Sequence, residues 1–495
     1  MQKKLFRKLA ITMAAESTIE KLCSKILYMK SYNYLLACCF AMVLGACDDV
    51  LEQEPQIQIA QETAITNKKG AEAAVAGMYN ELQAGDYYGR NFQIMSDITS
   101  DVAQSIGTWD FYREMDTYLT SIGNTENGNF WTRAYRAVNV ANNIISRVPE
   151  LTDVQEADKN SYLGQAYFVR GLAFFDLTRT YGGVPGVVGT LGVPLVTQPS
   201  VRVDESFFPS RPTLAESYKQ VEDDLLMALE LLPEQHASDI ATRSQAVKGT
   251  ARALLSRLYL YTNQPEKVIE YADQVIEDTK YSFVDNYLDI FQSKFTSESI
   301  FELNYNSADR SGIRNWYIPS SLGGRGDIAA HTSFYEDVTS NPNDIRGQLF
   351  GFSPGTNTYY PTKYIKAGDI DNVHIIRLSE IYLNRAEARA KSGDMDGALS
   401  DLNQIRSNAG IDAINTTGVE ETLEAIWHER KIELAFEGHS FFDLVRTGQA
   451  LTKLNSVERT NGPAVSLLDP NRQVFPIPSF DIDSNKNLEQ NEAYR

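Results

Sequence analysis

The chain has 495 residues, of which 43% are hydrophobic, so it is long enough to bury a large core and to form more than one domain. Its net charge of −19 is unevenly distributed: residues 1–46 hold seven basic and two acidic side chains, and the remainder holds 39 basic and 63 acidic ones. So acidic a surface repels phosphate groups and anionic lipid headgroups, which argues against nucleic acid as a partner and favours neutral or cationic ligands.

The N-terminal region predicts a signal peptide that ends in a lipid-attachment site. Residues 34–46 form an uncharged, mostly apolar run of 13 residues, too short for the roughly 20 helical residues that cross a bilayer. We interpret it as the apolar core of a signal peptide covering residues 1–46, with Met29 favoured as the true start. The sequence Leu44-Gly45-Ala46-Cys47 resembles a bacterial lipobox, so we expect Cys47 to be acylated, for example with palmitate, and to become the new N-terminus.

Cleavage at Cys47 would remove the other three cysteines, which are Cys23, Cys38 and Cys39. No disulfide could then form within the chain, and stability would have to come from packing. Residues 47–69 are interpreted as a lipidated tether to the folded part. The alternative interpretation of the apolar run is a short buried helix.

Nine later segments carry apolar residues at helical spacing, and they predict an all-α fold with few short strands in a single domain over residues 70–495. The predicted helices cover residues 70–85, 129–148, 161–181, 213–232, 246–262, 265–277, 375–393, 395–410 and 419–438. Between them lie long stretches rich in Gly, Pro, Ser and Asn, above all 182–212 and 304–362. We expect these two insertions to be irregular and to have a function, because ordering such long loops costs entropy.

Two of the predicted helix pairs show a repeat. Ser256 and Val268 are twelve residues apart, as are Ala386 and Ala398, and small residues at these offsets let paired helices approach closely. This is the packing scheme of tetratricopeptide units, and it predicts a superhelical scaffold of helix pairs. The helix at 161–181 is expected to be the first of another pair, with its partner near residue 213. Other antiparallel helix pairs also place small residues where they cross.

The patterns that would indicate catalysis are weak. The five histidines are scattered, and "HERKI" at 428–432 lacks the second histidine of a zinc-protease helix, so we expect no metal site and no cofactor. Glu433 and Glu437 are four residues apart and could face one another as a glycosidase acid–base pair. Because 63 acidic residues produce such pairs by chance, we expect the protein not to be an enzyme, and a helical glycosidase stays as a less favoured alternative.

Five segments together carry a resemblance to a known family. They are "FWTRAYRAVNVANNII" (130–145), "QAYFVRGLAFFDLTRTYGGVP" (165–185), "IIRLSEIYLNRAEARAKSGDMDGALSDLNQIRSNAG" (375–410), "HERKIELAFEGHSFFDLVRTG" (428–448) and "VFPIPSFDIDSNKNLEQNEAY" (474–494). Their content and order resemble the SusD/RagB family of Bacteroidetes outer-membrane lipoproteins. One departure is Ser440, where the family commonly has Arg, so a local salt bridge is expected to be absent.

The resemblance implies tetratricopeptide units on one side of the protein and irregular ligand-binding segments on the other. Members of the family lie over a SusC-like TonB-dependent barrel and capture oligosaccharides, or peptides in some branches, for nutrient uptake and polysaccharide utilization. The chain would accordingly be a surface-exposed outer-membrane lipoprotein anchored at Cys47. Asp48 and Asp49 resemble the acidic tag that sends such lipoproteins to the surface, although they are equally compatible with a solvated tether.

Candidate ligand-binding residues come from two predicted loops. A neutral sugar is bound by flat aromatic faces together with planar polar side chains. Segments 105–114 and 302–326 offer both, and they match by position the segments that supply such contacts in the family. The candidates are Trp109, Asp110, Tyr112 and Arg113 in the first loop and Tyr305, Asn306, Arg314, Asn315, Trp316 and Tyr317 in the second. Each ring could instead fill a gap in the core, which is the interpretation we favour for Trp131 and Trp427 on amphipathic helices.

Overall fold

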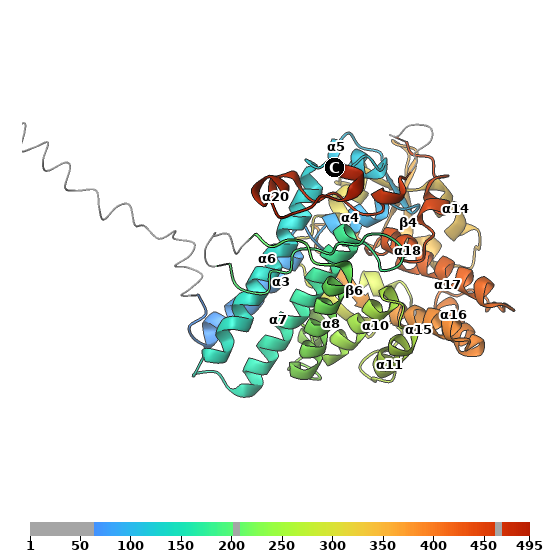
Figure 1. The fold of residues 1–495 in the computed structure, drawn as a ribbon. Coiled ribbons are helices and arrows are strands. Elements are labelled where there is room, and N and C mark those ends of the chain that lie inside the picture. Colours follow the sequence, from blue (N-terminus) through green and yellow to red (C-terminus); the bar gives the residue numbers. More distant parts are fainter. Residues whose placement is uncertain (1–63, 201–207, 461–467) are drawn as a thin grey trace, which may run out of the picture. The chain divides into compact units, whose positions relative to one another are not determined.

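The computed structural model describes residues 64–200, 208–460 and 468–495, all within the unit Ala64–Arg495 (Figure 1). The predicted signal peptide (1–46), the lipidation site Cys47 and the tether up to residue 63 lie outside the described residues and stay predictions. Helices dominate the unit and its strands are short, which confirms the predicted fold class.

The nine predicted helices are all present, with small shifts at their ends. They are α3 (Lys68–Gln83), α6 (Thr125–Arg147), α7 (Glu156–Leu177), α8 (Leu214–Leu231), α10 (Lys248–Tyr261), α11 (Pro265–Ile276), α15 (Leu378–Ser392), α16 (Met395–Asn408) and α17 (Val419–Leu434). Residues 375–377, predicted as helix, instead belong to strand β6 (Val373–Arg377), which pairs with β2 (Ser299–Leu303), and α17 ends at Leu434 rather than at residue 438. Both strands are fully buried, and such short apolar runs do not distinguish a strand from a buried helix.

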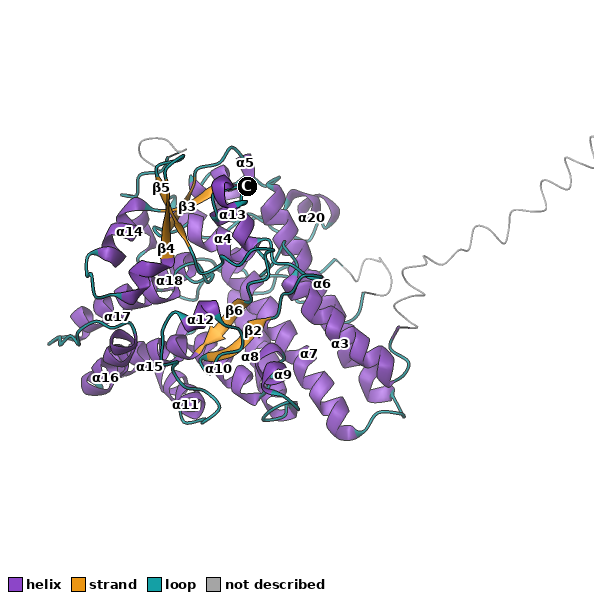
Figure 2. Cartoon of the chain, turned by 180° about the vertical axis from the view of Figure 1, so that it is seen from behind, coloured by secondary structure: helices purple, strands orange, loops and turns teal. Residues whose placement is uncertain are grey.

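Consecutive helices pack as the predicted pairs α7–α8, α10–α11 and α15–α16, and α11 packs on α15 (Figures 1 and 2). Small residues lie where the helices cross. A Cβ atom on Gly164 of α7 would come within 2.8 Å of Leu232 Cγ, so the helices could not approach as closely with a larger residue there. Ala386 and Ala398 are fully buried in one apolar cluster between α15 and α16. These contacts confirm the tetratricopeptide-like packing.

Most of the other elements form the opposite end of this unit (Figure 2). They are α4 (Asn91–Ile98), β1 (Ala103–Ser105), α5 (Asp110–Asp116), α13 (Ile313–Tyr317), β3 (Ile328–Ala330), α14 (Thr332–Thr339), β4 (Phe350–Ser353), β5 (Thr358–Pro361), α18 (Ser440–Arg446), α19 (Ala450–Leu454) and α20 (Ser479–Ser484). Two short helices, α9 (Asp239–Ser244) and α12 (Asp289–Gln292), lie instead beside the β2–β6 sheet. Four of the strands form a sheet in the order β1-β3-β5-β4. The insertion 304–362, predicted as irregular, therefore holds three of these strands, two α-helices and two short 3-10 helices.

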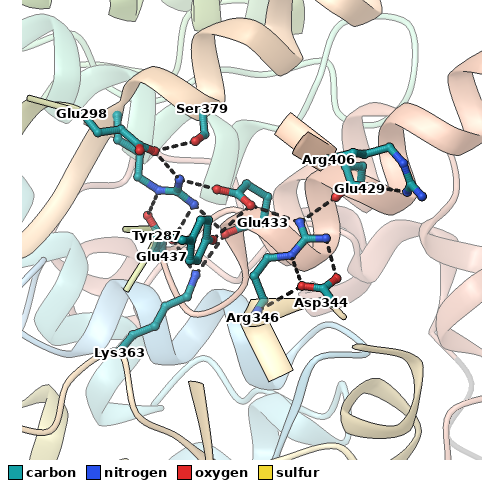
Figure 3. Close-up of polar contacts among 11 residues, drawn as sticks. Tyr287, Glu298, Asp344, Arg346, Lys363, Ser379, Arg406, Glu429, Glu433 and Glu437 are labelled. Atoms are coloured by element: carbon teal, nitrogen blue, oxygen red, sulfur yellow. Dashed lines mark hydrogen bonds and ion pairs between the residues drawn. The ribbon is translucent and has the colours of Figure 1, made fainter. Parts of the chain in front are cut away.

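A network of buried charges links the β2–β6 sheet, α17 and the segment that follows β5 (Figure 3). Its centre is Arg377, whose side chain is 1% exposed. Arg377 Nη1 lies 2.6 Å from Glu433 Oε1 and 3.0 Å from Glu298 Oε1, and Nε lies 2.8 Å from Glu437 Oε2. Lys363 Nζ pairs with Glu437 Oε1 at 2.7 Å. Each of these charges has a partner of opposite sign, which is the condition under which buried ions are tolerated.

Candidate ligand-binding surface

Two segments more than 200 residues apart are joined by the antiparallel pairing of β1 with β3. Ala103 pairs with Ala330 and Ser105 with Ile328. The contact continues past the strands, where the amides of Ile106 and Gly107 both donate to the carbonyl of Asp327 at 2.8 and 3.0 Å. This pairing brings the two loops that the sequence singled out to the same end of the unit.

The indoles of the two loops meet there. The rings of Trp109 and Trp316 lie 6.4 Å apart in an edge-on arrangement, and Phe111 lies 5.3 Å from Trp109 and 6.1 Å from Trp316. Trp109 is 42% exposed, whereas Trp316 is 7% exposed. We call Trp109, Phe111 and Trp316 the aromatic surface. Its exposed ring is Trp109, and Trp316 forms the floor on which that ring rests.

Two guanidinium groups lie over these rings. The Cζ atom of Arg325 is 4.9 Å from the Trp109 ring and 4.7 Å from the Trp316 ring, so this cation lies between the two indoles. Arg90 lies over the Trp316 ring at 5.3 Å. Attraction between a cation and an aromatic face holds such side chains in place and leaves planar N–H groups beside the rings. Arg325 therefore supplies the polar donors of this surface.

The helices beneath the aromatic surface are held by polar contacts. Asn124 donates through Nδ2 to the carbonyl of Phe111 at 2.9 Å, which fixes the first turn of α5. Tyr112 points the other way, is fully buried, and donates its hydroxyl to Asn91 Oδ1 on α4 at 3.1 Å. Burial raises the pKa of Tyr112, so the hydroxyl stays protonated as a donor. The segment 110–116 is thus a helix, α5, where the sequence showed no helical periodicity.

Four of the predicted contact residues are buried and bonded within the protein. Tyr112, Tyr305 and Tyr317 are at most 1% exposed, and Arg314 is 8% exposed. The Tyr305 hydroxyl donates to the carbonyl of Gln83 at 2.8 Å, and Arg314 donates to two backbone carbonyls. The structure places these side chains in the core under the aromatic surface, so they support that surface and are not exposed on it. Aromatic content in a loop does not reveal which rings face inward.

Tyr317 has a particular partner in the core. Its hydroxyl donates to Asp97 Oδ2 at 2.6 Å, and both side chains are buried. Burial raises the pKa of Asp97 to about 7, although the Tyr317 hydroxyl opposes this effect. This contact fixes α13, the helix that carries Trp316, against α4.

The remaining predicted polar residues lie near the surface of the unit. Asp110 is exposed and Arg113 is partly buried on α5, and their side chains form a loose ion pair of 3.5 Å. Asn315 is partly buried, and its carbonyl accepts from the amide of Arg325 at 2.6 Å, which helps to place that guanidinium. Asn306 is exposed, and its side chain accepts from the amides of Ala308 and Asp309 in a local turn.

Sequence reasoning missed Arg325 and Arg90 as components of this surface. Arg325 lies in "SLGGRGD", and a cation between glycines in a loop with aromatic residues was the available signal. Arg90 carried no signal, because it reaches Trp316 only through the tertiary fold. Trp131 is 4% exposed, as predicted for a core residue, whereas Trp427 is only partly buried.

The predicted glycosidase pair is not available to a substrate. Glu433 is fully buried on α17, and Glu437 is 5% exposed and lies beyond the helix end at Leu434. Both carboxylates bind Arg377 (Figure 3). Burial alone would raise the pKa of Glu437, but Arg377 and Lys363 lower it to about 2. A general acid must hold a proton near neutral pH, so this arrangement does not support acid–base catalysis.

Ser440, at the start of α18, borders a small cavity. The cavity has a volume of about 80 Å³ and is also lined by Glu424, Trp427, Lys431 and Asp443. The Ser440 hydroxyl and the Trp427 indole N–H are buried without a hydrogen-bond partner among the described residues. A side chain longer than serine would fill this space.

The described residues lack two further features. No group of three or more His, Cys, Asp or Glu side chains is arranged to hold a metal ion there. Over the same residues, none of the helices has both the length and the apolar character needed to span a bilayer.

Comparisons with known proteins agree with the fold. A family model described as "SusD family" matches residues 323–494, and one described as "Starch-binding associating with outer membrane" matches residues 49–260. The chain belongs to the SusD/RagB family. A crystal structure of a SusD superfamily protein from Bacteroides thetaiotaomicron is 27% identical to this SusD-like chain, with a TM-score of 0.76, and the match covers 86% of this chain and 100% of that one.

Two curated relatives extend the comparison. A SusD-like protein from Formosa agariphila is 25% identical over 523 residues, which is 94% of this chain and 99% of the relative. The starch-binding protein SusD of Bacteroides thetaiotaomicron is 32% identical over 139 residues, covering 27% of this chain and 24% of the relative. The first of these matches spans nearly the whole length of both chains, and the second covers about a quarter of each.

Proposed function

We propose that this SusD-like protein is a lipid-anchored outer-membrane protein that captures oligosaccharides and passes them, unaltered, to a SusC-like TonB-dependent barrel for import. The observation that carries the proposal is the aromatic surface, where the exposed ring of Trp109 lies beside the stacked donors of Arg325. Sugar rings pack their C–H faces on such rings, and their hydroxyls bond to planar donors.

The relatives support this function without extending it to a particular sugar. One matching family model and one relative are described as starch-binding, and the family model is also described as associating with the outer membrane. Capture requires binding alone, which agrees with the burial and pairing of Glu433 and Glu437.

Calorimetric titration with a panel of soluble oligosaccharides and peptides tests the binding step. We expect retention of an oligosaccharide that is recovered with its length unchanged. Trp109→Ala should weaken binding by about tenfold, as expected for the loss of one stacking ring. The matched control is Phe352→Ala, which removes another exposed ring, 47% accessible, from strand β4 at the far edge of the sheet, and it should leave affinity unchanged.

Tight binding of a peptide and of no glycan would replace this proposal with the peptide-capturing branch of the family. Shortened products would instead indicate a glycosidase. Unchanged affinity in Trp109→Ala would show that the ligand binds elsewhere. For the anchor and the partner, Cys47→Ser should move the protein from the membrane fraction to the soluble fraction, and the unaltered protein should co-purify with a TonB-dependent barrel from outer membranes.

A further inference from the structure

The charges around the aromatic surface indicate which chemical class of glycan this surface would bind. Arg325, between the two indoles, directs Nε to Asp327 Oδ2 at 2.7 Å. Its terminal amino groups have no hydrogen-bond partner among the described residues. The guanidinium is therefore neutralised by a carboxylate on one side and still offers N–H donors on the other.

The neighbouring arginines are paired as well. Arg90, the second cation over the floor of the surface, lies 2.5 Å from Glu126 Oε2 and 3.7 Å from Asp86 Oδ1. Arg113 on α5 lies 3.5 Å from Asp110 Oδ1. Each of the three arginines around the two indoles thus faces at least one carboxylate, so none of these three presents an uncompensated positive charge.

We propose that the aromatic surface selects neutral oligosaccharides and rejects glycans that carry uronate or sulfate groups. This inference rests on the proposed function and specifies its ligand class. An anionic group that approached Arg325 would have to displace Asp327 or lie beside its negative charge, whereas a sugar hydroxyl can accept from the free amino groups without either cost. The acidic body of the chain adds repulsion at longer range, because residues 47–495 hold 39 basic and 63 acidic side chains.

One cation of the second loop is not neutralised in this way. Arg310 is exposed, its Nε donates to the carbonyl of Ser307 at 3.2 Å, and no carboxylate among the described residues lies within ion-pair distance of it. It lies two residues before Gly312, which packs on Arg90. Arg310 is the side chain through which an acidic glycan could still be attracted, so its substitution belongs in the test.

The experiment compares matched pairs of oligosaccharides that share a linkage and differ in charge. Suitable pairs are laminarihexaose and maltohexaose with their C6-oxidised forms, and methyl-esterified with free oligogalacturonate, each titrated at low salt. In every pair that binds, we expect the acidic member to bind at least about tenfold more weakly. The ratio of the dissociation constants of the acidic and neutral members should shrink as added salt screens the repulsion.

Two variants shift the ratio in opposite directions. Asp327→Asn frees the positive charge of Arg325 and should reduce the preference for the neutral member at least about fivefold, whereas Arg325→Gln should increase it. Asp396→Asn is the matched control, because it changes the net charge by the same amount at an exposed position on α16 and should leave the ratio unchanged. If circular dichroism shows that Asp327→Asn is misfolded, Arg325→Gln and the salt series carry the test.

Equal or tighter binding of the acidic member by the unaltered protein would overturn the inference, and loss of that binding in Arg310→Ala would identify the cation responsible. A shift in Asp396→Asn as large as that in Asp327→Asn would also overturn it, since net charge rather than the pairing of Arg325 would then set the preference. Failure of every neutral and acidic member to bind would instead refute the proposed function.

Discussion

Removal of the Arg377 charge should destabilise the protein more than any single change at its surface. In Arg377→Met, the carboxylates of Glu298, Glu433 and Glu437 lose a cation that lies 2.6 to 3.0 Å from their oxygens. Breaking one buried ion pair costs about 3–5 kcal/mol. The three losses do not add, because Glu433 keeps Arg346 and Glu437 keeps Lys363. Burial already raises the pKa of Glu298 to about 7, so that carboxyl can be protonated at little cost. We expect a total loss of about 4 kcal/mol.

Urea denaturation at pH 7, followed by circular dichroism, measures this loss. Lys219→Met is the control, because it removes a lysine whose side chain is 60% exposed and pairs with Asp223, and it should cost no more than about 0.5 kcal/mol. The loss in Arg377→Met should also shrink as the pH falls. Arg377 helps to hold the pKa of Glu437 at about 2, so its pairing stabilises the protein above pH 4 to 5, and this stabilisation is lost as the pH falls towards 2. A loss below about 1 kcal/mol at pH 7, or one that does not depend on pH, would refute this reasoning.

Three further changes test other parts of the structure. Asp97→Asn removes a carboxyl whose pKa is raised to about 7 in the native protein, so the stabilisation that this carboxyl provides is complete below pH 4 and is lost as the pH rises through 7. The variant should therefore reduce the difference in unfolding free energy between pH 4 and pH 8 by about 4 kcal/mol. An unchanged difference would contradict this. Gly164→Ala places a methyl group against Leu232 and should lower the free energy of unfolding by about 1 kcal/mol. Gly77→Ala on α3 is the control, because its methyl group would meet no atom within 4 Å, and it should raise the free energy of unfolding by about 1 kcal/mol. Equal changes in the two variants would rule out close packing as the reason. Ser440→Arg should fill the cavity beside Asp443 and Glu424 and raise the melting temperature by about 2 °C, and a lower melting temperature by calorimetry would count against this.

The sequence was sufficient for the helical scaffold because its helices depend on local patterns. Apolar spacing identified the nine long helices, and the small residues at Ala386 and Ala398 identified their pairing. These signals lie within one helix or between neighbours in the chain. The strand β6 was missed because its few residues continue without interruption into α15, so that the apolar pattern of the two elements reads as one helix.

The candidate site was only partly predictable because it is assembled by distant contacts. Both indoles were identified from composition, but strands of three residues, such as β1 and β3, give no usable signal. Their pairing places Arg325 between Trp109 and Trp316. The side on which a ring is buried also depends on that pairing, so Tyr112, Tyr305 and Tyr317 could not be separated from Trp109 by sequence alone.

The pairing of β1 with β3 has a consequence for the order of events during biosynthesis. Residue 103 must find residue 330, and closing so long a loop is slow compared with forming neighbouring helices. A nascent or truncated chain that ends before residue 330 can build its first helix pairs but lacks this strand pairing, and with it the assembled aromatic surface. On the proposed function, we expect such fragments to retain no ligand, so that ligand retention would report that synthesis and folding of the chain have passed this point.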